Sequence, residues 1–273
     1  MNTSAHLSKL VSNWAPYQKV VRHKASQLRN RWFPPPYVWR TLTDPSQSGA
    51  AGQYPAPRTE IVNLIDSTIP QRQVIDIGCG NAATARAIKD RFPLAYVIGV
   101  EPNPAAAKLA ETRLDRIIQA PIDMLDYDAL DIKPHTIDTA LFLDVLEHLY
   151  DPWTALERLR PRLASDAQII ASIPNIRNYW ILSNLITKGE FSYGPNGLLD
   201  ITHIRFFTRR EIERLFVETG YRIISLINKF DERVPIDLHP KTEELQKFAL
   251  TNLTDDDIVE LRTFQFYVIA SPK

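Results

Sequence analysis

The stretch VIDIGCGNAA, Val74–Ala83, has the pattern of a buried strand that runs into a glycine turn and then into a helix. Residues 78–83 fit the spacing G-x-G-x-x-A of a dinucleotide-binding turn. Glycine is useful there because it lets the backbone approach a nucleotide-like cofactor where a side chain would collide. Taken alone, the spacing favours a nicotinamide-dependent oxidoreductase. A single glycine motif is weak evidence, however, so the rest of the chain must identify the cofactor.

The composition predicts a globular protein that stays in the cytoplasm. Of the 273 residues, 44% are hydrophobic, but no apolar run approaches the roughly 20 residues that span a bilayer. The amino terminus lacks an apolar segment ending in small residues, so we expect no secretory signal. The single cysteine, Cys79, excludes an internal disulfide framework and fits a reducing compartment.

The net charge of zero hides a basic amino-terminal head. Residues 1–43 contain seven Lys and Arg residues and no acid, which leaves the remainder with a net charge of −7. A solvated helical face is the preferred interpretation. Contact with an anionic substrate, a membrane surface or nucleic acid are the alternatives.

Proline-rich segments predict two parts of the chain. Residues 1–32 have a helical apolar stripe, and a linker rich in proline and small residues is expected at about 43–57. We therefore predict a helical cap and linker over 1–56 and a larger domain over 57–273.

The larger domain alternates strand and helix patterns. Strands are expected at 73–77, 95–100, 116–119, 138–143, 167–173, 221–227 and 264–271, with helices between most of them. Helix starts are indicated by Asn103-Pro104, by Asp151-Pro152 and by a capping box from Thr208 to Glu211. The alternation predicts an α/β fold with a doubly wound, mostly parallel sheet.

The ordered stretches from VIDIGCG to TGYRII resemble class I S-adenosylmethionine-dependent methyltransferases over roughly the last three quarters of the chain. More narrowly, LFLDVLEHLYDPW, IIASIPNIRNY and LLDITHIRFFT resemble a branch found beside polysaccharide and natural-product glycosyltransferases. The resemblance implies a seven-stranded sheet with an antiparallel edge strand beside the sixth strand, and S-adenosylmethionine as cofactor. An oxidoreductase domain does not require that last strand.

The resemblance also implies a set of cofactor-binding residues. Gly78 and Gly80 would let the backbone approach the methionine part of the cofactor, and Asp76 would order the turn and receive the ammonium group. Glu101 would accept both ribose hydroxyls, although an oxidoreductase would also place an acid there. The full predicted set is Asp76, Gly78, Cys79, Gly80, Glu101, Pro102, Ile122, Asp123, Leu143 and Asp144.

The chain departs from the family at the adenine end. Most members carry an acidic residue after the third strand, where Pro121 stands here. Either Asp123 replaces it, or backbone and apolar contacts from Ile122 and Met124 hold the adenine.

Two polar clusters are candidates for catalysis. In LDVLEHL, the spacing of Asp144, Glu147 and His148 is compatible with a metal site, but a hydrogen-bonded corner is the preferred interpretation and we predict no metal. In DITHIRFFT, His203 is the first candidate for a general base acting together with methyl transfer, and His148 is the second.

The acceptor is expected to contact an insert over 174–207 that carries Tyr179, Tyr193, Asp200 and Arg205. We predict O-methylation of a sugar or natural-product hydroxyl. The alternatives are N- or carboxyl methylation of a small molecule or peptide, a nicotinamide-dependent oxidoreductase, and a binding protein that keeps the fold without catalysis. The acceptor is a small molecule, glycan or peptide, with an anionic one suited to the basic head, and no nucleic acid is expected. The head would close the acceptor pocket or else serve in homodimer formation or membrane contact.

Overall fold

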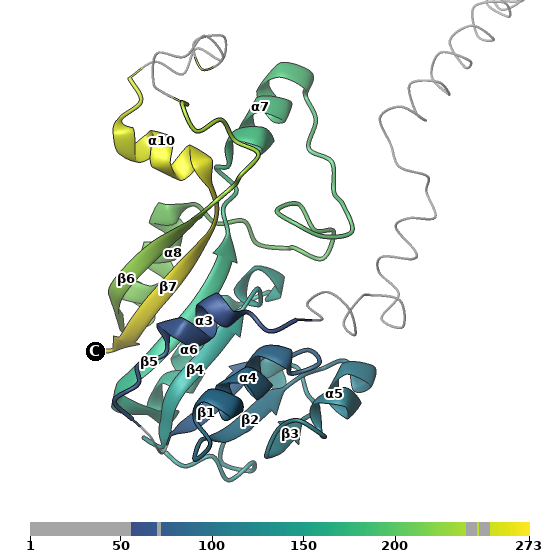
Figure 1. The fold of residues 1–273 in the computed structure, drawn as a ribbon, viewed down its shortest axis with the longest axis vertical. Helices are drawn as coiled ribbons and strands as arrows, with labels where there is room; N and C mark the ends of the chain where they lie inside the picture. Colours follow the sequence, from purple (N-terminus) through teal and green to yellow (C-terminus); the bar gives the residue numbers. More distant parts are fainter. Residues whose placement is uncertain (1–55, 70–71, 239–244, 246–251) are drawn as a thin grey trace, which may run out of the picture. The chain divides into compact units, whose positions relative to one another are not determined.

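A computed structural model describes residues 56–69, 72–238, 245 and 252–273 (Figure 1). The predicted cap and nearly all of the predicted linker lie outside these residues. Within the described part, no helix is both long enough and apolar enough to cross a membrane.

The described strands form one seven-stranded sheet in the order β3-β2-β1-β4-β5-β7-β6. They are β1 (Gln73–Ile77), β2 (Tyr96–Val100), β3 (Arg116–Ile118), β4 (Ile137–Leu143), β5 (Leu163–Pro174), β6 (Tyr221–Phe230) and β7 (Thr263–Pro272). The pairs among β1 to β5 are parallel, whereas β7 pairs antiparallel with both β5 and β6. The predicted sheet, with its antiparallel strand beside the sixth, is confirmed. In detail, β7 is inserted one place in from the edge, and β6 forms the edge itself.

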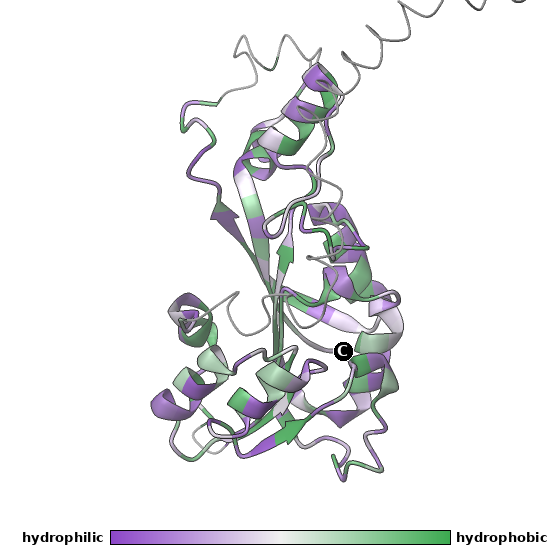
Figure 2. Cartoon of the chain, turned by 90° about the vertical axis from the view of Figure 1, so that its right-hand side faces the viewer, coloured by the Kyte–Doolittle hydropathy of each residue, from purple (hydrophilic) through white to green (hydrophobic). Residues whose placement is uncertain are grey.

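Helices cover both faces of the sheet (Figure 1). They are α3 (Thr59–Leu64), α4 (Ala83–Arg91), α5 (Pro104–Ala110), α6 (Pro152–Leu159), α7 (Tyr179–Lys188), α8 (Arg209–Glu218) and α10 (Asp255–Arg262). Apolar residues of α3, α4 and α5 join one hydrophobic cluster and those of α6 and α8 join another. The helices carry hydrophilic and hydrophobic residues along their length, as expected where one side packs on a sheet (Figure 2).

The alternation of side-chain direction along each strand explains why one hydrophobic cluster lies on each face of the sheet. In β4, Leu141 packs with α3 and α4, while its neighbours Ala140 and Phe142 belong to the cluster on the other face. Side chains point to opposite faces at successive strand positions, so a strand buried on both faces reads as a continuous apolar run. Packing in the core therefore fixes the position of each strand along its own axis, and with it the position of the residues at its carboxyl end.

The helix starts follow the predicted caps with one correction. The side chains of Asn103 and Asp151 accept hydrogen bonds from the first-turn amides of α5 and α6. Only half of the predicted capping box at α8 forms: Thr208 accepts from the amide of Glu211, but the Glu211 carboxylate pairs with Arg214 instead. A complete capping box, missed in the sequence, starts α10 at Thr254.

The predicted insert is closed at its base by a bridge between Asn175 and Phe207. It contains α7, which ends at Gly189 in the left-handed region at φ +65°. A small apolar cluster of Tyr179 with residues of α10 and the segment after β6 supports it. The insert is thus anchored at both ends and has a fixed position beside the sheet.

Candidate functional site

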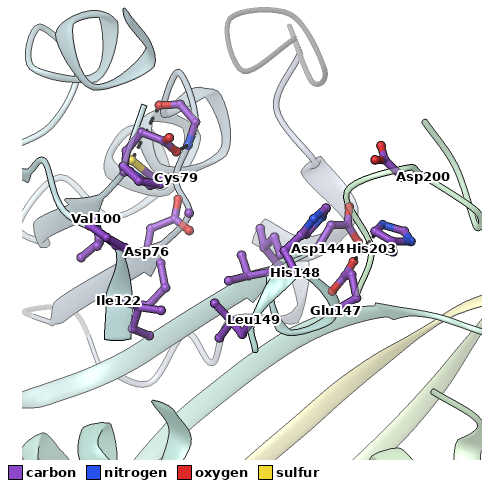
Figure 3. Close-up of a pocket in the computed structure, with 18 of the residues that line it drawn as sticks. Asp76, Cys79, Val100, Ile122, Asp144, Glu147, His148, Leu149, Asp200 and His203 are labelled. Atoms are coloured by element: carbon purple, nitrogen blue, oxygen red, sulfur yellow. Dashed lines mark hydrogen bonds and ion pairs between the residues drawn. The ribbon is translucent and has the colours of Figure 1, made fainter. Parts of the chain in front are cut away.

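A cavity of about 730 Å³ opens at the carboxyl ends of β1, β2 and β4, where open α/β sheets bind their ligands. All ten predicted cofactor residues line it: Asp76, Gly78, Cys79, Gly80, Glu101, Pro102, Ile122, Asp123, Leu143 and Asp144. His148, Asp200 and His203 line it as well. Figure 3 shows Asp76, Cys79 and Ile122 toward one end and the two histidines toward the other.

The glycine turn is shaped by contacts inside the protein. Gly78 has φ +69°, and a Cβ atom there would lie 2.6 Å from the Cγ2 atom of Val145. The amides of Gly78 and Cys79 both donate to the carbonyl of Val100, at 2.7 and 3.1 Å. The sequence attributed Gly78 to close approach of the cofactor. The structure adds a second reason, since Val145 on the neighbouring loop already fills the space of a side chain.

Glu101 is held by the backbone on either side of it. One carboxylate oxygen accepts a hydrogen bond from the Gly80 amide at 2.9 Å, and the other accepts from the Asn103 amide at 2.8 Å. Each carboxylate oxygen can accept more than one hydrogen bond, so both keep capacity for a ligand hydroxyl. The side chain ties the glycine turn to the start of α5 and faces the cavity.

Burial controls the ionisation of two side chains at the glycine turn. It raises the pKa of the Asp76 carboxyl to about 7, with the Glu101 charge as the next cause, while Arg58 acts in the opposite direction. Burial also raises the pKa of the Cys79 thiol far above its ordinary range. Cys79 is therefore a neutral turn residue rather than a nucleophile.

Asp144 belongs to a hydrogen-bonded network that sequence reasoning missed. One of its oxygens accepts from Arg58 at 3.1 Å, and the other accepts from Ser172 at 2.7 Å and Gln265 at 2.9 Å. Asp144 itself has φ +57°, a strained value for a residue with a side chain. Arg58 and Gln265 come from opposite ends of the domain, so no local pattern could have found them.

The segment predicted to contact adenine forms part of the cavity wall. Pro121, Ile122 and Asp123 line the cavity, and Ile122 is buried. Met124 is 75% exposed and is not among the lining residues, which removes it from the two apolar contacts considered for adenine. Ile122 and the Pro121 ring remain as apolar groups in this part of the lining.

At the other end, the insert places His203 against the corner after β4. The amides of Ile204 and Arg205 both donate to the carbonyl of Glu147 at 3.0 Å. His203 Nε2 lies 3.9 Å from the Glu147 carboxylate, and the rings of His148 and His203 meet edge to face with centroids 4.7 Å apart. The three potential ligand side chains that gather here are therefore Glu147, His148 and His203, whereas the spacing in the sequence had grouped Asp144 with Glu147 and His148.

Both imidazoles are oriented by backbone carbonyls. His203 Nδ1 lies 3.1 Å from the carbonyl oxygen of Leu198, and His148 Nδ1 lies 3.2 Å from that of Thr202. A carbonyl only accepts, so each Nδ1 carries the proton and each Nε2 presents a lone pair. Burial lowers the pKa of both rings, which favours their neutral forms.

Three predicted acceptor residues lie away from this cavity. Tyr179 packs in the small cluster beside α10, and Tyr193 contacts Phe191 and Phe206. Arg205 donates to the carbonyl of Tyr150, and its guanidinium lies over the rings of Tyr150 and Trp153. The structure does not bring these three side chains to the lining with Asp200.

Similarity to known proteins agrees with this arrangement. A family profile described as "Methyltransferase domain" matches residues 41–226. The malonyl-[acyl-carrier protein] O-methyltransferase of Geobacter sulfurreducens is 26% identical over 177 residues, which cover 65% of this chain and 64% of that protein. The trans-aconitate 2-methyltransferase of Methylobacterium radiotolerans is 31% identical over 120 residues, or 44% of each chain.

A solved structure of a SAM-dependent methyltransferase from Archaeoglobus fulgidus shares the fold, with a TM-score of 0.53 and 19% identity over 79% of this chain and 94% of that one. The sheet order, the glycine turn and the acidic residue after β2 are all accounted for by one family. The chain belongs to the methyltransferase-domain family of class I, S-adenosylmethionine-dependent methyltransferases.

Proposed function

We propose that the protein transfers the methyl group of S-adenosylmethionine to a hydroxyl oxygen of a small molecule, with a sugar or natural-product hydroxyl as the favoured acceptor. In this reaction the acceptor oxygen forms a bond to the methyl carbon while the carbon–sulfur bond breaks. The electron pair of that bond stays on sulfur, giving S-adenosylhomocysteine, and the hydroxyl proton leaves the acceptor.

The observation that carries the proposal is the continuity of one cavity from the glycine turn to the paired histidines. At one end, Asp76, Gly80 and Glu101 offer carboxylates and a close backbone approach to an amino acid and a ribose. At the other end, His148 and His203 present neutral Nε2 atoms. Alignment of acceptor and methyl group inside such a cavity supplies much of the rate acceleration.

A hydroxyl acceptor gives the histidines a role. An alcohol is far too weakly acidic to ionise by itself, so a group that receives its proton during transfer assists the reaction. His203 is the first candidate, because it is the more deeply placed of the two and the insert holds it in position. Asp200, which also lines the cavity, would help to orient the acceptor.

Carboxyl methylation is the second candidate, because the two curated relatives carry malonyl and trans-aconitate in their names, both of which contain carboxylates. A carboxylate is already ionised at neutral pH and needs no base. Under this alternative, removal of His203 would affect the fit of the acceptor but not a proton transfer.

Isotope transfer separates the candidates. The full chain is incubated with S-adenosylmethionine labelled at the methyl carbon and with panels of nucleotide-linked sugars, phenols, carboxylic acids and amines. Mild base hydrolyses methyl esters but leaves methyl ethers intact, so base-stable label on a hydroxyl compound supports the proposal. Label found only in esters establishes the second candidate, and binding of NAD without any response to S-adenosylhomocysteine refutes both.

The role of His203 is tested by His203→Ala. We expect turnover to fall by roughly 10²–10⁴-fold if His203 assists proton removal, while the affinity for S-adenosylhomocysteine is unchanged. His135→Asn is the matched control, since His135 is exposed before β4, outside the cavity lining. Full turnover in His203→Ala would rule out this role.

A further inference from the structure

We propose that Glu147, His148 and His203 form a binding site for one divalent transition-metal cation at the acceptor end of the cavity. The inference deepens the proposed function and rests on it for its chemical purpose. One ligand atom from each residue can be chosen so that the three lie within 4.8 Å of one another. The three side chains gather at one end of the cavity in Figure 3.

The first argument is the state of Glu147. Its side chain is 1% exposed, and neither carboxylate oxygen accepts a hydrogen bond from another described residue. Buried carboxylates need a compensating charge or a full set of donors, because burial removes the water that would solvate them. The guanidinium of Arg58 forms an ion pair with Asp144, and its charge acts on Glu147 without donating a hydrogen bond to it. A cation between Glu147 and the two imidazoles would supply the missing partner.

The second argument is the orientation of the rings. Histidines that ligate metals characteristically donate their other ring N–H to a carbonyl or a carboxylate, which fixes the tautomer and the ring plane. His203 and His148 each have Nδ1 at a backbone carbonyl, of Leu198 and Thr202 respectively. Their Nε2 lone pairs are therefore held ready, and His203 Nε2 is the atom that faces Glu147.

A supporting layer continues behind His148. Its Nδ1 also lies 3.1 Å from the Thr202 hydroxyl, which in turn donates to the Asp200 carboxylate at 2.6 Å. This places a carboxylate one step behind the imidazole, an arrangement that increases the basicity of a ligating ring. A merely structural histidine corner would not require Glu147 to lack a hydrogen bond from every other described residue.

The donor set points to the kind of cation. Two imidazoles and one carboxylate suit Zn²⁺, Mn²⁺, Co²⁺ or Fe²⁺, whereas Mg²⁺ and Ca²⁺ prefer all-oxygen sites. Bonds of about 2.0–2.1 Å require ligand atoms about 3–3.5 Å apart in tetrahedral or octahedral geometry. The separation of up to 4.8 Å therefore calls for side-chain closure on binding. Three protein ligands leave at least one coordination position open toward the cavity.

An open position beside the cofactor would serve the proposed reaction. A hydroxyl bound to a divalent cation loses its proton much more readily than a free one. His203 would then act as a ligand rather than as the proton acceptor. The hydroxyl proton would pass to water, and the resulting oxyanion would attack the methyl carbon as described above.

Calorimetry on the full chain tests the site directly. Protein treated with a chelator and then freed of it is titrated with Zn²⁺ alone and with Mn²⁺ alone, without acceptor. We expect one site per chain that His203→Ala and His148→Ala each weaken by at least 100-fold. Glu147→Gln keeps the shape of the side chain but removes its charge, and is expected to weaken binding at least tenfold. His135→Asn should leave binding unchanged.

Binding of S-adenosylhomocysteine is measured in every variant as a check of the fold, and His203→Gln replaces His203→Ala if the latter is unfolded. Absent binding, or binding that the three substitutions do not alter, overturns the metal site and identifies Glu147 as a buried neutral acid. That result leaves the proposed methyl transfer standing if the label is still transferred. Conversely, metal binding without transfer to any acceptor supports the site and contradicts the proposed function.

Discussion

The two ends of the cavity differ in how their polar groups are satisfied. At the glycine-turn end, the Glu101 carboxylate accepts hydrogen bonds from the backbone amides of Gly80, 21 positions before it, and Asn103, two positions after it. At the acceptor end, the Glu147 carboxylate accepts none from another described residue, although it is as deeply buried. A carboxylate already held by two backbone amides is set in position before the ligand arrives. A buried carboxylate that accepts no hydrogen bond from another described residue fits a group that a bound cation would neutralise.

The boundary between the two ends is the Asp144 network, and breaking it should have the largest effect. Arg58→Met keeps the apolar stem but leaves Asp144 without its guanidinium partner. Because the pair is largely buried, we expect the free energy of unfolding to fall by about 3–5 kcal/mol. Urea denaturation measures this. Arg86→Met, in the exposed pair with Asp90 on α4, is the control and should cost no more than about 0.5 kcal/mol.

A loss of stability no larger in Arg58→Met than in the control would contradict the structural role of the network. Both ends of the cavity would then be supported independently of it.

The buried Asp76 carboxyl should make the cofactor end sensitive to pH. Its pKa is raised from 3.8 to about 7 in the folded protein, so the native state binds more protons than the unfolded state between about pH 4 and 7. Stability therefore falls as the pH rises through this window and levels off above it. A shift of this size corresponds to about 4 kcal/mol. Asp76→Asn should remove this part of the pH dependence.

Urea denaturation of both proteins at pH 5 and pH 8 gives the measurement. Other carboxyls contribute equally to the two curves, so the difference between them isolates Asp76. Parallel pH dependence in the two proteins would show that Asp76 is ionised with an ordinary pKa.

The glycine turn can be probed with a pair of glycines that share a backbone conformation. Gly78→Ala combines the cost of φ +69° with a clash against Val145, for which we expect about 2–4 kcal/mol of lost stability. Gly189→Ala has φ +65° with no atom within 4 Å of the added Cβ, so only the conformational cost of about 1–2 kcal/mol applies. Thermal or urea denaturation compares the two.

Adding Val145→Ala should recover part of the loss in Gly78→Ala and none in Gly189→Ala. Equal losses of stability in the two glycine variants would mean that the turn rearranges to avoid Val145. The contact with Val145 would then not explain why a glycine stands at position 78.

The smallest expected effect concerns ligand contacts of Glu101. Glu101→Ala should weaken the binding of S-adenosylhomocysteine by about 1–3 kcal/mol, because charged hydrogen bonds are lost. Calorimetry measures this change. Glu111→Ala, at the exposed end of α5, should have no effect. Unchanged affinity in Glu101→Ala would restrict Glu101 to its structural contacts with Gly80 and Asn103.

Local patterns predicted which residues line the glycine-turn end of the cavity. The strand, turn and helix around Gly78, the acidic residue at the end of β2 and the caps at Asn103 and Asp151 depend on neighbours within a few residues. Such features follow from backbone conformation and alternation alone. The incomplete capping box at Thr208 is also a local feature. The Glu211 carboxylate has two possible partners on one turn of the helix, a backbone amide and Arg214, and the sequence does not show which of them it binds.

By itself, then, the sequence determined the α/β fold, the order of elements and the residues of the cofactor turn, because each is encoded by contiguous residues. Tertiary structure alone decided the arrangement around the two histidines. His148 meets Thr202 across 54 positions of the chain, where the insert packs on the corner after β4, and Arg58 meets Asp144 across 86, where the start of α3 reaches that corner. No spacing in the chain encodes them, since they arise only once the two hydrophobic clusters have fixed the sheet. The fold of the insert also keeps Tyr179, Tyr193 and Arg205 out of the cavity lining and leaves Glu147 buried beside two imidazoles.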